Sequence, residues 1–101
     1  MILYNVTTSV DNDVAQEWLK WMKETHIPEI MATTYFVKFQ MAKVLEEEDN
    51  GGSTYAVQYY ARHMADLNEF YQAHDATLQA KAQARYPGKY VDFRTVLEVV
   101  D

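Results

Sequence analysis

The chain has 101 residues, of which 49% are hydrophobic and 24% charged, a size and composition typical of one globular domain over residues 1–101. Nine lysine and arginine residues stand against fifteen aspartate and glutamate residues, and the net charge of −6 argues against nucleic acid or an anionic membrane surface as a partner. No cysteine is present, which excludes disulfide bonds, thiolate metal ligands and a cysteine nucleophile.

The first half of the chain predicts a strand, a helix and a second strand. Residues 2–9 are rich in β-branched and aromatic side chains, which favours a strand. Apolar side chains recur at steps of three and four over residues 14–26, which predicts an amphipathic helix that ends or kinks before Pro28. A further short turn can continue to Met31. In residues 35–45, large apolar or aromatic side chains recur at every second position, which is the pattern of a strand.

The second half predicts the remaining elements. The acidic and glycine-rich residues 46–53 form a solvated turn, so that residues 54–61 pair with the preceding strand in a long hairpin. Residues 64–84 form a second amphipathic helix, and residues 90–100 form a last strand. With right-handed crossovers, the order βαββαβ gives an α+β, ferredoxin-like fold, in which two helices cover one face of a four-stranded antiparallel sheet.

Two helices cover only one face of such a sheet. The pattern of each strand must therefore indicate which side chains face the helices and which lie on the uncovered face. We expect the apolar side chains of the last strand, Val91, Phe93, Thr95, Leu97 and Val99, to face the helices. The uncovered face would then carry Asn5, Lys38, Gln40, Ala42, Ala56, Gln58, Tyr60, Asp92, Arg94, Val96 and Glu98. Either water covers this mixed face, or two sheets pack face to face in a C2 homodimer, a dimeric α/β barrel with a polar-lined cavity between the sheets.

Histidine and arginine supply the candidates for chemistry. His26 lies where the first helix breaks, so it either caps the helix carbonyls or acts as a general acid or base. Arg94 either belongs to a cross-strand ion-pair network or anchors a ligand carboxylate. His74 lies on the apolar stripe of the second helix, where a core position and a ligand-binding position are both open.

Further candidate ligand-binding residues supply the walls and the polar anchors of a cavity. Tyr4, Trp18 and Tyr59 would form walls, and Asn5 and Gln58 would join Arg94 as anchors. A slip of one residue in the first strand would exchange Tyr4 for Asn5 at the cavity. The three histidines have no metal-binding spacing, so we expect neither a metal site nor a resident cofactor.

Four segments resemble an uncharacterised bacterial family, domain of unknown function 4286, within the dimeric α/β-barrel superfamily. They are Tyr4-Asn5-Val6-Thr7, the run from Trp18 to Met31 with His26-Ile27-Pro28-Glu29, Tyr55-Ala56-Val57-Gln58-Tyr59, and Phe93-Arg94-Thr95-Val96-Leu97-Glu98. The resemblance spans nearly the whole chain and implies a ferredoxin-like homodimer. It implies no activity, because none is established for the family.

The wider superfamily suggests functions only by analogy, because one fold serves many chemistries. Its members include cofactor-free monooxygenases, heme-degrading monooxygenases, mutarotases and stress-response proteins, and several place a histidine near a proline as His26 does here. The heme-degrading type resembles this chain at Asn5 and at the second-helix His74, but this chain has tyrosine where that type has a third-strand tryptophan. We therefore expect a cytoplasmic homodimer that binds a small molecule or performs cofactor-free oxygenase or isomerase chemistry. The alternatives are a purely structural or protein-interaction dimer without a ligand site and a heme-binding monooxygenase-like protein.

Overall fold

The computed structural model describes residues 1–46 and 51–101, so part of the predicted turn over residues 46–53 lies outside the described residues. The elements follow the predicted order βαββαβ, and each predicted helix is built from two α-helical segments joined by a π-helical turn. They are β1 (Ile2–Asp11), α1 (Ala15–Trp21), η1 (Met22–His26), α2 (Ile27–Ala32), β2 (Lys38–Lys43), β3 (Gly52–Ala61), α3 (Met64–Phe70), η2 (Tyr71–Asp75), α4 (Ala76–Arg85) and β4 (Tyr90–Glu98).

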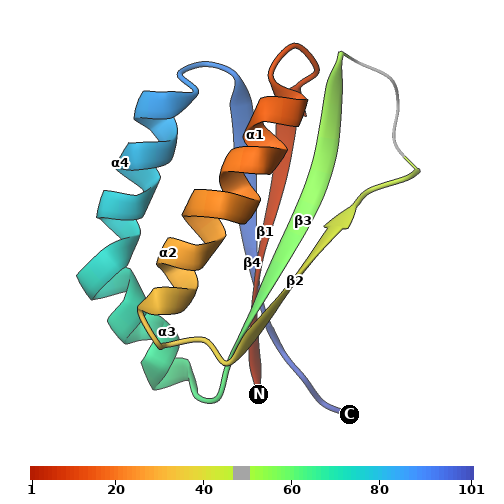
Figure 1. Ribbon diagram of the computed structural model, residues 1–101. Helices are drawn as coiled ribbons and strands as arrows, with labels where there is room; N and C mark the ends of the chain where they lie inside the picture. The colour runs from red at the N-terminus through yellow and green to blue at the C-terminus, as the bar shows by residue number, and fades with distance from the viewer. Residues whose placement is uncertain (47–50) are drawn as a thin grey trace.

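The four strands form one antiparallel sheet in the order β2-β3-β1-β4. Both helical arms, α1-η1-α2 and α3-η2-α4, lie on the same face of this sheet, as Figure 1 shows. The ferredoxin-like prediction is therefore confirmed. The molecule has two layers, and the second face of the sheet is left without a covering element among the described residues.

The helical path does not end at Pro28 but continues through α2 to Ala32. Pro28 is the second residue of α2 and has no backbone N–H to donate within the helix. The π-helical turn η1 precedes it and widens the helix by one residue, which accommodates the proline without a break. The predicted kink is thus a local change of helical pitch, and it lies next to His26.

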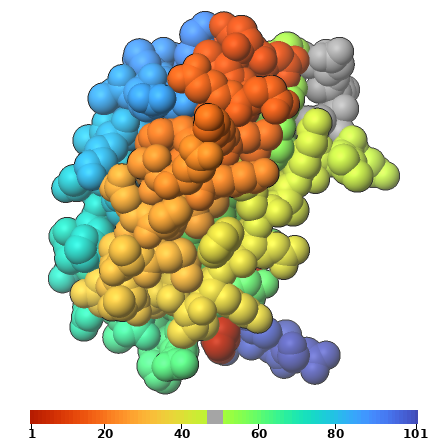
Figure 2. All heavy atoms as spheres, viewed as in Figure 1, coloured from red at the N-terminus to blue at the C-terminus, as the bar shows by residue number. Residues whose placement is uncertain are grey.

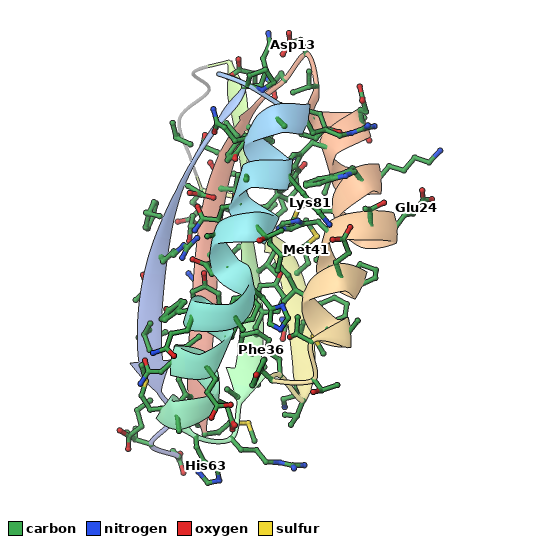
Figure 3. All side chains as sticks on the ribbon, turned by 90° about the vertical axis from the view of Figure 1, so that its left-hand side faces the viewer. Asp13, Glu24, Phe36, Met41, His63 and Lys81 are labelled. Atoms are coloured by element: carbon green, nitrogen blue, oxygen red, sulfur yellow. The ribbon has the colours of Figure 1, made fainter. Side chains whose placement is uncertain are left out.

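Aromatic side chains fill the layer between the helices and the sheet. Tyr4 on β1 is 2% exposed, and its ring lies 6.1 Å from the ring of Phe36 and 6.0 Å from that of Tyr59. The Phe70 ring of α3 completes this cluster at 6.2 Å from Tyr4. Figure 3 shows the labelled Phe36 among the side chains between the two layers. The core is therefore a set of tilted and stacked rings, which fixes the distance between helices and sheet.

The prediction for the faces of β4 was wrong. Arg94 pairs with Val6 and Asp92 pairs with Thr8, and residues directly opposite each other in a sheet share a face. Asp92, Arg94, Val96 and Glu98 therefore lie on the helix side, and Val91, Phe93, Thr95 and Leu97 lie on the open face. The rule that apolar side chains face the helices fails here because the helix layer leaves a partly polar cavity beside β4, whereas β4 itself presents apolar side chains to the open face.

Large apolar side chains are exposed on this open face and beyond the end of β4. Val91 is 72% exposed, Phe93 64% and Leu97 46%. The C-terminal residues project from the body of the molecule, as the space-filling view in Figure 2 shows, and Val100 is 91% exposed. None of the helices described over residues 1–46 and 51–101 is long and apolar enough to span a membrane.

Candidate functional site

A cavity of about 60 Å³ lies between the helices and the sheet. This volume is several times the minimum of about 10–15 Å³ that a single buried water needs. Both helical arms and strands β1, β3 and β4 contribute to its walls. The lining residues are Tyr4, Val6, Thr8, Trp18, Trp21, Met22, His26, Ile30, Val57, Tyr59, Phe70, Asp75, Leu78, Gln79, Ala82, Tyr90, Asp92 and Arg94.

His26 enters the cavity from the π-helical turn η1. Its ring stacks on that of Trp21 with centroids 4.7 Å apart, because a π-helical turn brings residues five apart onto one side of the helix. The Nδ1 atom of His26 is buried and has no hydrogen-bond partner among the described residues. Burial lowers the pKa of His26, and nearby Glu29 opposes this effect. The site therefore holds a neutral imidazole with an unused hydrogen-bonding nitrogen.

The lowered pKa of His26 predicts a loss of stability in acid. The unfolded chain takes up a proton near pH 6.5, whereas folded His26 resists it, so the free energy of unfolding should fall as the pH drops below this value. Urea denaturation between about pH 7.5 and about pH 5.5 measures the slope. His26→Gln should flatten the slope and the matched variant of the exposed histidine, His63→Gln, should not. An unchanged slope in His26→Gln would contradict the effect of burial.

An ion pair forms the polar side of the cavity. Arg94 Nη1 on β4 donates a hydrogen bond to Asp75 Oδ2 at the end of η2, over 2.9 Å, and the two side chains are 27% and 19% exposed. The Arg94 guanidinium also lies over the ring of Tyr4, 5.7 Å from its centroid. Burial raises the pKa values of the Tyr4 and Tyr59 hydroxyls, so both remain protonated at neutral pH.

Seven residues were predicted to line a cavity between the sheets of two copies. Five of them, Tyr4, Trp18, His26, Tyr59 and Arg94, instead line this cavity between the helices and the sheet of one chain. The other two, Asn5 and Gln58, are cross-strand partners of each other and point to the opposite, open face. There the Nδ2 of Asn5 donates to Thr7 Oγ1 over 3.0 Å, and its buried Oδ1 has no hydrogen-bond partner in residues 1–46 and 51–101. Because side chains alternate along β1, Asn5 lies on the open face when its neighbour Tyr4 faces the helices.

Sequence reasoning missed Asp75 as a cavity residue. The sequence pattern predicted that His74 lies on the inward side of the second helix. The π-helical turn η2 contains one residue more than an α-helical turn, so Asp75 faces the cavity instead of His74. The available signal was the spacing of Tyr71, Asp75, Leu78 and Ala82, which also follows steps of three and four. A carboxylate at an inward position indicates a buried partner, and here that partner is Arg94.

A separate groove of about 370 Å³ runs outside the cavity between α2 and α4. It contains His74, whose ring lies 5.9 Å from that of Tyr35, and it is bridged by the ion pair of Lys81 and Glu29 at 2.9 Å. Figure 3 shows Lys81 on the side of α4 toward the first helical arm. No group of three or more metal-ligating side chains occurs within residues 1–46 and 51–101.

Comparisons with known proteins agree with this architecture. The sequence pattern of a family described as "Domain of unknown function (DUF4286)" matches residues 1–100. A dimeric ferredoxin-like protein from an uncultured marine organism has a similar structure, with a TM-score of 0.72 and 13% identity over 100% of this chain and 96% of the other. The structure of SnoaB, a cofactor-independent oxygenase from Streptomyces nogalater, matches with a TM-score of 0.62 and 14% sequence identity. The match covers 99% of this chain and 94% of the other.

A variant of MhuD with two manganese protoporphyrin IX molecules bound per active site gives a TM-score of 0.72 and 14% identity, over 100% of this chain and 96% of the other. No curated protein matches this chain. At these identities the likenesses establish the fold alone. The described residues do not fit a porphyrin, because a porphyrin is far larger than the cavity of about 60 Å³ and His74 lies outside that cavity.

Proposed function

We propose that this chain, which belongs to the family described as a domain of unknown function (DUF4286), binds a small molecule in the cavity between its helices and its sheet. The observation that carries the proposal is a cavity of about 60 Å³ whose lining combines His26 with the half-buried ion pair of Arg94 and Asp75. Within the described residues His26 Nδ1 has no hydrogen-bond partner, so the imidazole beside the cavity keeps unused hydrogen-bonding capacity. Aromatic rings and a few placed polar groups are the ordinary lining of small-molecule sites.

Proton transfer is the chemistry that these residues support. The neutral imidazole of His26 can accept a proton from a ligand bound against it, and the stacked Trp21 holds the ring in one orientation. The protonated hydroxyls of Tyr4 and Tyr59 can donate hydrogen bonds but do not act as bases near neutral pH. This set of groups suits a binding protein or a cofactor-free oxygenase or isomerase.

Filling the cavity tests the proposal. Ala82 lines the cavity and Ala84 on the same helix is exposed, so Ala82→Leu and Ala84→Leu add the same atoms inside and outside the site. Nuclear magnetic resonance titration with propan-1-ol should give saturable shifts at Trp21 and His26 in the parent chain and in Ala84→Leu. We expect Ala82→Leu to weaken this binding about tenfold or more, since the added side chain occupies the ligand volume.

The same titration separates a ligand-binding protein from a purely structural one. Shifts confined to exposed residues, with the same response in Ala82→Leu and Ala84→Leu, would leave the fold as a structural or protein-interaction dimer. Thermal unfolding of both variants checks that each remains folded, because overpacking a core costs about 1–3 kcal/mol.

We also propose that the open face of the sheet joins two copies of the chain in a homodimer. The exposed Val91, Phe93 and Leu97 form an apolar strip along β4, of the kind that marks an interaction surface. A row of side chains in register across the four strands, Gln40, Gln58, Asn5 and Thr95, crosses this strip at Thr95. Amides both donate and accept hydrogen bonds, so the exposed amide groups of this row can pair with the same row of a second copy.

A further inference from the structure

The charges inside the cavity do not balance. Its charged lining residues are Asp75, Asp92 and Arg94. The Arg94 guanidinium already donates to Asp75 over 2.9 Å. The Asp92 side chain has no hydrogen bond or ion pair within the described residues 1–46 and 51–101. A ligand carboxylate would therefore meet no free cation, whereas a ligand cation would meet a free carboxylate.

The apolar lining also favours a cation. The cavity wall contains the rings of Tyr4, Trp18, Trp21, Tyr59, Phe70 and Tyr90. Aromatic faces attract ammonium and guanidinium groups, and Arg94 already lies over the ring of Tyr4 with 5.7 Å between its central carbon and the ring centroid. The net charge of the chain, −6, adds a weaker attraction for cations approaching from solvent.

His26 supplies the third feature. His26 lines the cavity, its Nδ1 has no hydrogen-bond partner within the described residues, and a neutral imidazole can present one nitrogen as an acceptor of an N–H hydrogen bond. An ammonium group has only donors, so it suits a lining that offers an acceptor imidazole and the Asp92 carboxylate. A carboxylate ligand has only acceptors and would leave Asp92 repelling it.

We propose that the cavity binds the ammonium group of a small alkylamine in preference to a carboxylate, with Asp92 as its counter-ion. The inference rests on the proposed function and adds the class of ligand to it. A volume of about 60 Å³ admits a group of a few carbon atoms. A longer amine can extend out past Asp92, which is exposed and so marks the mouth of the cavity.

Three ligands of the same carbon chain length test the preference: propylamine, propan-1-ol and propionate. Each is titrated into the protein, and the chemical shifts of Trp21, His26 and Asp92 are followed. We expect propylamine to bind about fivefold or more tightly than propan-1-ol, since Asp92 is partly solvated, and we expect propionate to bind most weakly.

Three variants assign the preference to named charges. Asp92→Asn should bind propylamine and propan-1-ol with nearly equal affinity. Glu98→Gln removes the same charge from the same strand outside the cavity and should keep the parent preference. Asp75→Asn releases Arg94 from its ion pair and should make propionate bind severalfold more tightly than in the parent chain.

Equal affinities for the three ligands, or tightest binding of propionate to the parent chain, would overturn the inference while leaving the proposed function in place. The same holds if Glu98→Gln loses the preference as fully as Asp92→Asn, because the selectivity would then follow net charge. If none of the three ligands shifts the cavity residues, and Ala82→Leu and Ala84→Leu respond alike, the proposed function itself fails.

Discussion

Phe93→Glu is expected to convert the proposed homodimer into a folded monomer. Phe93 is 64% exposed on the open face of the sheet, so the substitution removes apolar area from the proposed interface and places a carboxylate there instead. Burying an unpaired charge at an interface typically costs several kcal/mol. We expect the dimer dissociation constant to rise by about a hundredfold or more, measured by sedimentation velocity over a range of concentrations.

The control for this variant places a glutamate elsewhere on the surface. Leu45 is 84% exposed and lies between β2 and β3, outside the paired strands, so Leu45→Glu should leave the dissociation constant unchanged. Circular dichroism should show the same secondary structure in both variants, because neither side chain belongs to the buried core. A Phe93→Glu variant that sediments as a dimer would show that the copies meet through another surface.

The element order and the core could be predicted from the sequence because both depend on local periodicity. The alternation over β3 placed Val57 and Tyr59 on the helix side, and both are buried there. The side of β1 that faces the helices stayed open in the sequence, and the structure places Tyr4 there. The strand pairing then followed from the connection rules for βαβ units. At the β3 positions the sequence pattern alone indicates the buried side, and contacts from distant parts of the chain do not change it.

The face of β4 could not be predicted from the same rule. Both faces of this strand are part apolar, and the pattern alone gives no sign of which face meets the helices. The structure places Arg94 inward because the guanidinium finds Asp75 there, and it places Phe93 outward, where a second copy can cover it. The alternation of side chains along β4 shows that its two faces differ in polarity. Which face is buried depends on the groups that pack against each one.

The candidate site depends on two further features that leave little trace in a single sequence. The π-helical turns η1 and η2 each shift the inward side of a helix by one residue, which orients His26 against Trp21 and exchanges His74 for Asp75. Helix propensities do not distinguish such a turn from an ordinary one. The tendency of π-helical turns to occur at functional sites agrees with their position at the two sides of the cavity.

The ion pair of Arg94 and Asp75 carries the second large prediction. Arg94→Met keeps most of the side-chain volume but leaves Asp75, 19% exposed, without its cation beside the ring of Tyr4. A buried carboxylate that loses its partner is strongly destabilising, and we expect the free energy of unfolding to fall by about 2 kcal/mol. Urea denaturation at neutral pH measures the change.

The double variant separates the ion pair from simple packing. Arg94→Met combined with Asp75→Asn removes both charges, so the uncompensated carboxylate disappears. We expect the double variant to be more stable than Arg94→Met alone, with a coupling free energy of about 1–2 kcal/mol between the two positions. Additive losses would mean that Arg94 stabilises the fold by its contact with the Tyr4 ring and not by its charge. The charge balance of the cavity would then also change, because an uncoupled Arg94 would be free to meet a ligand carboxylate.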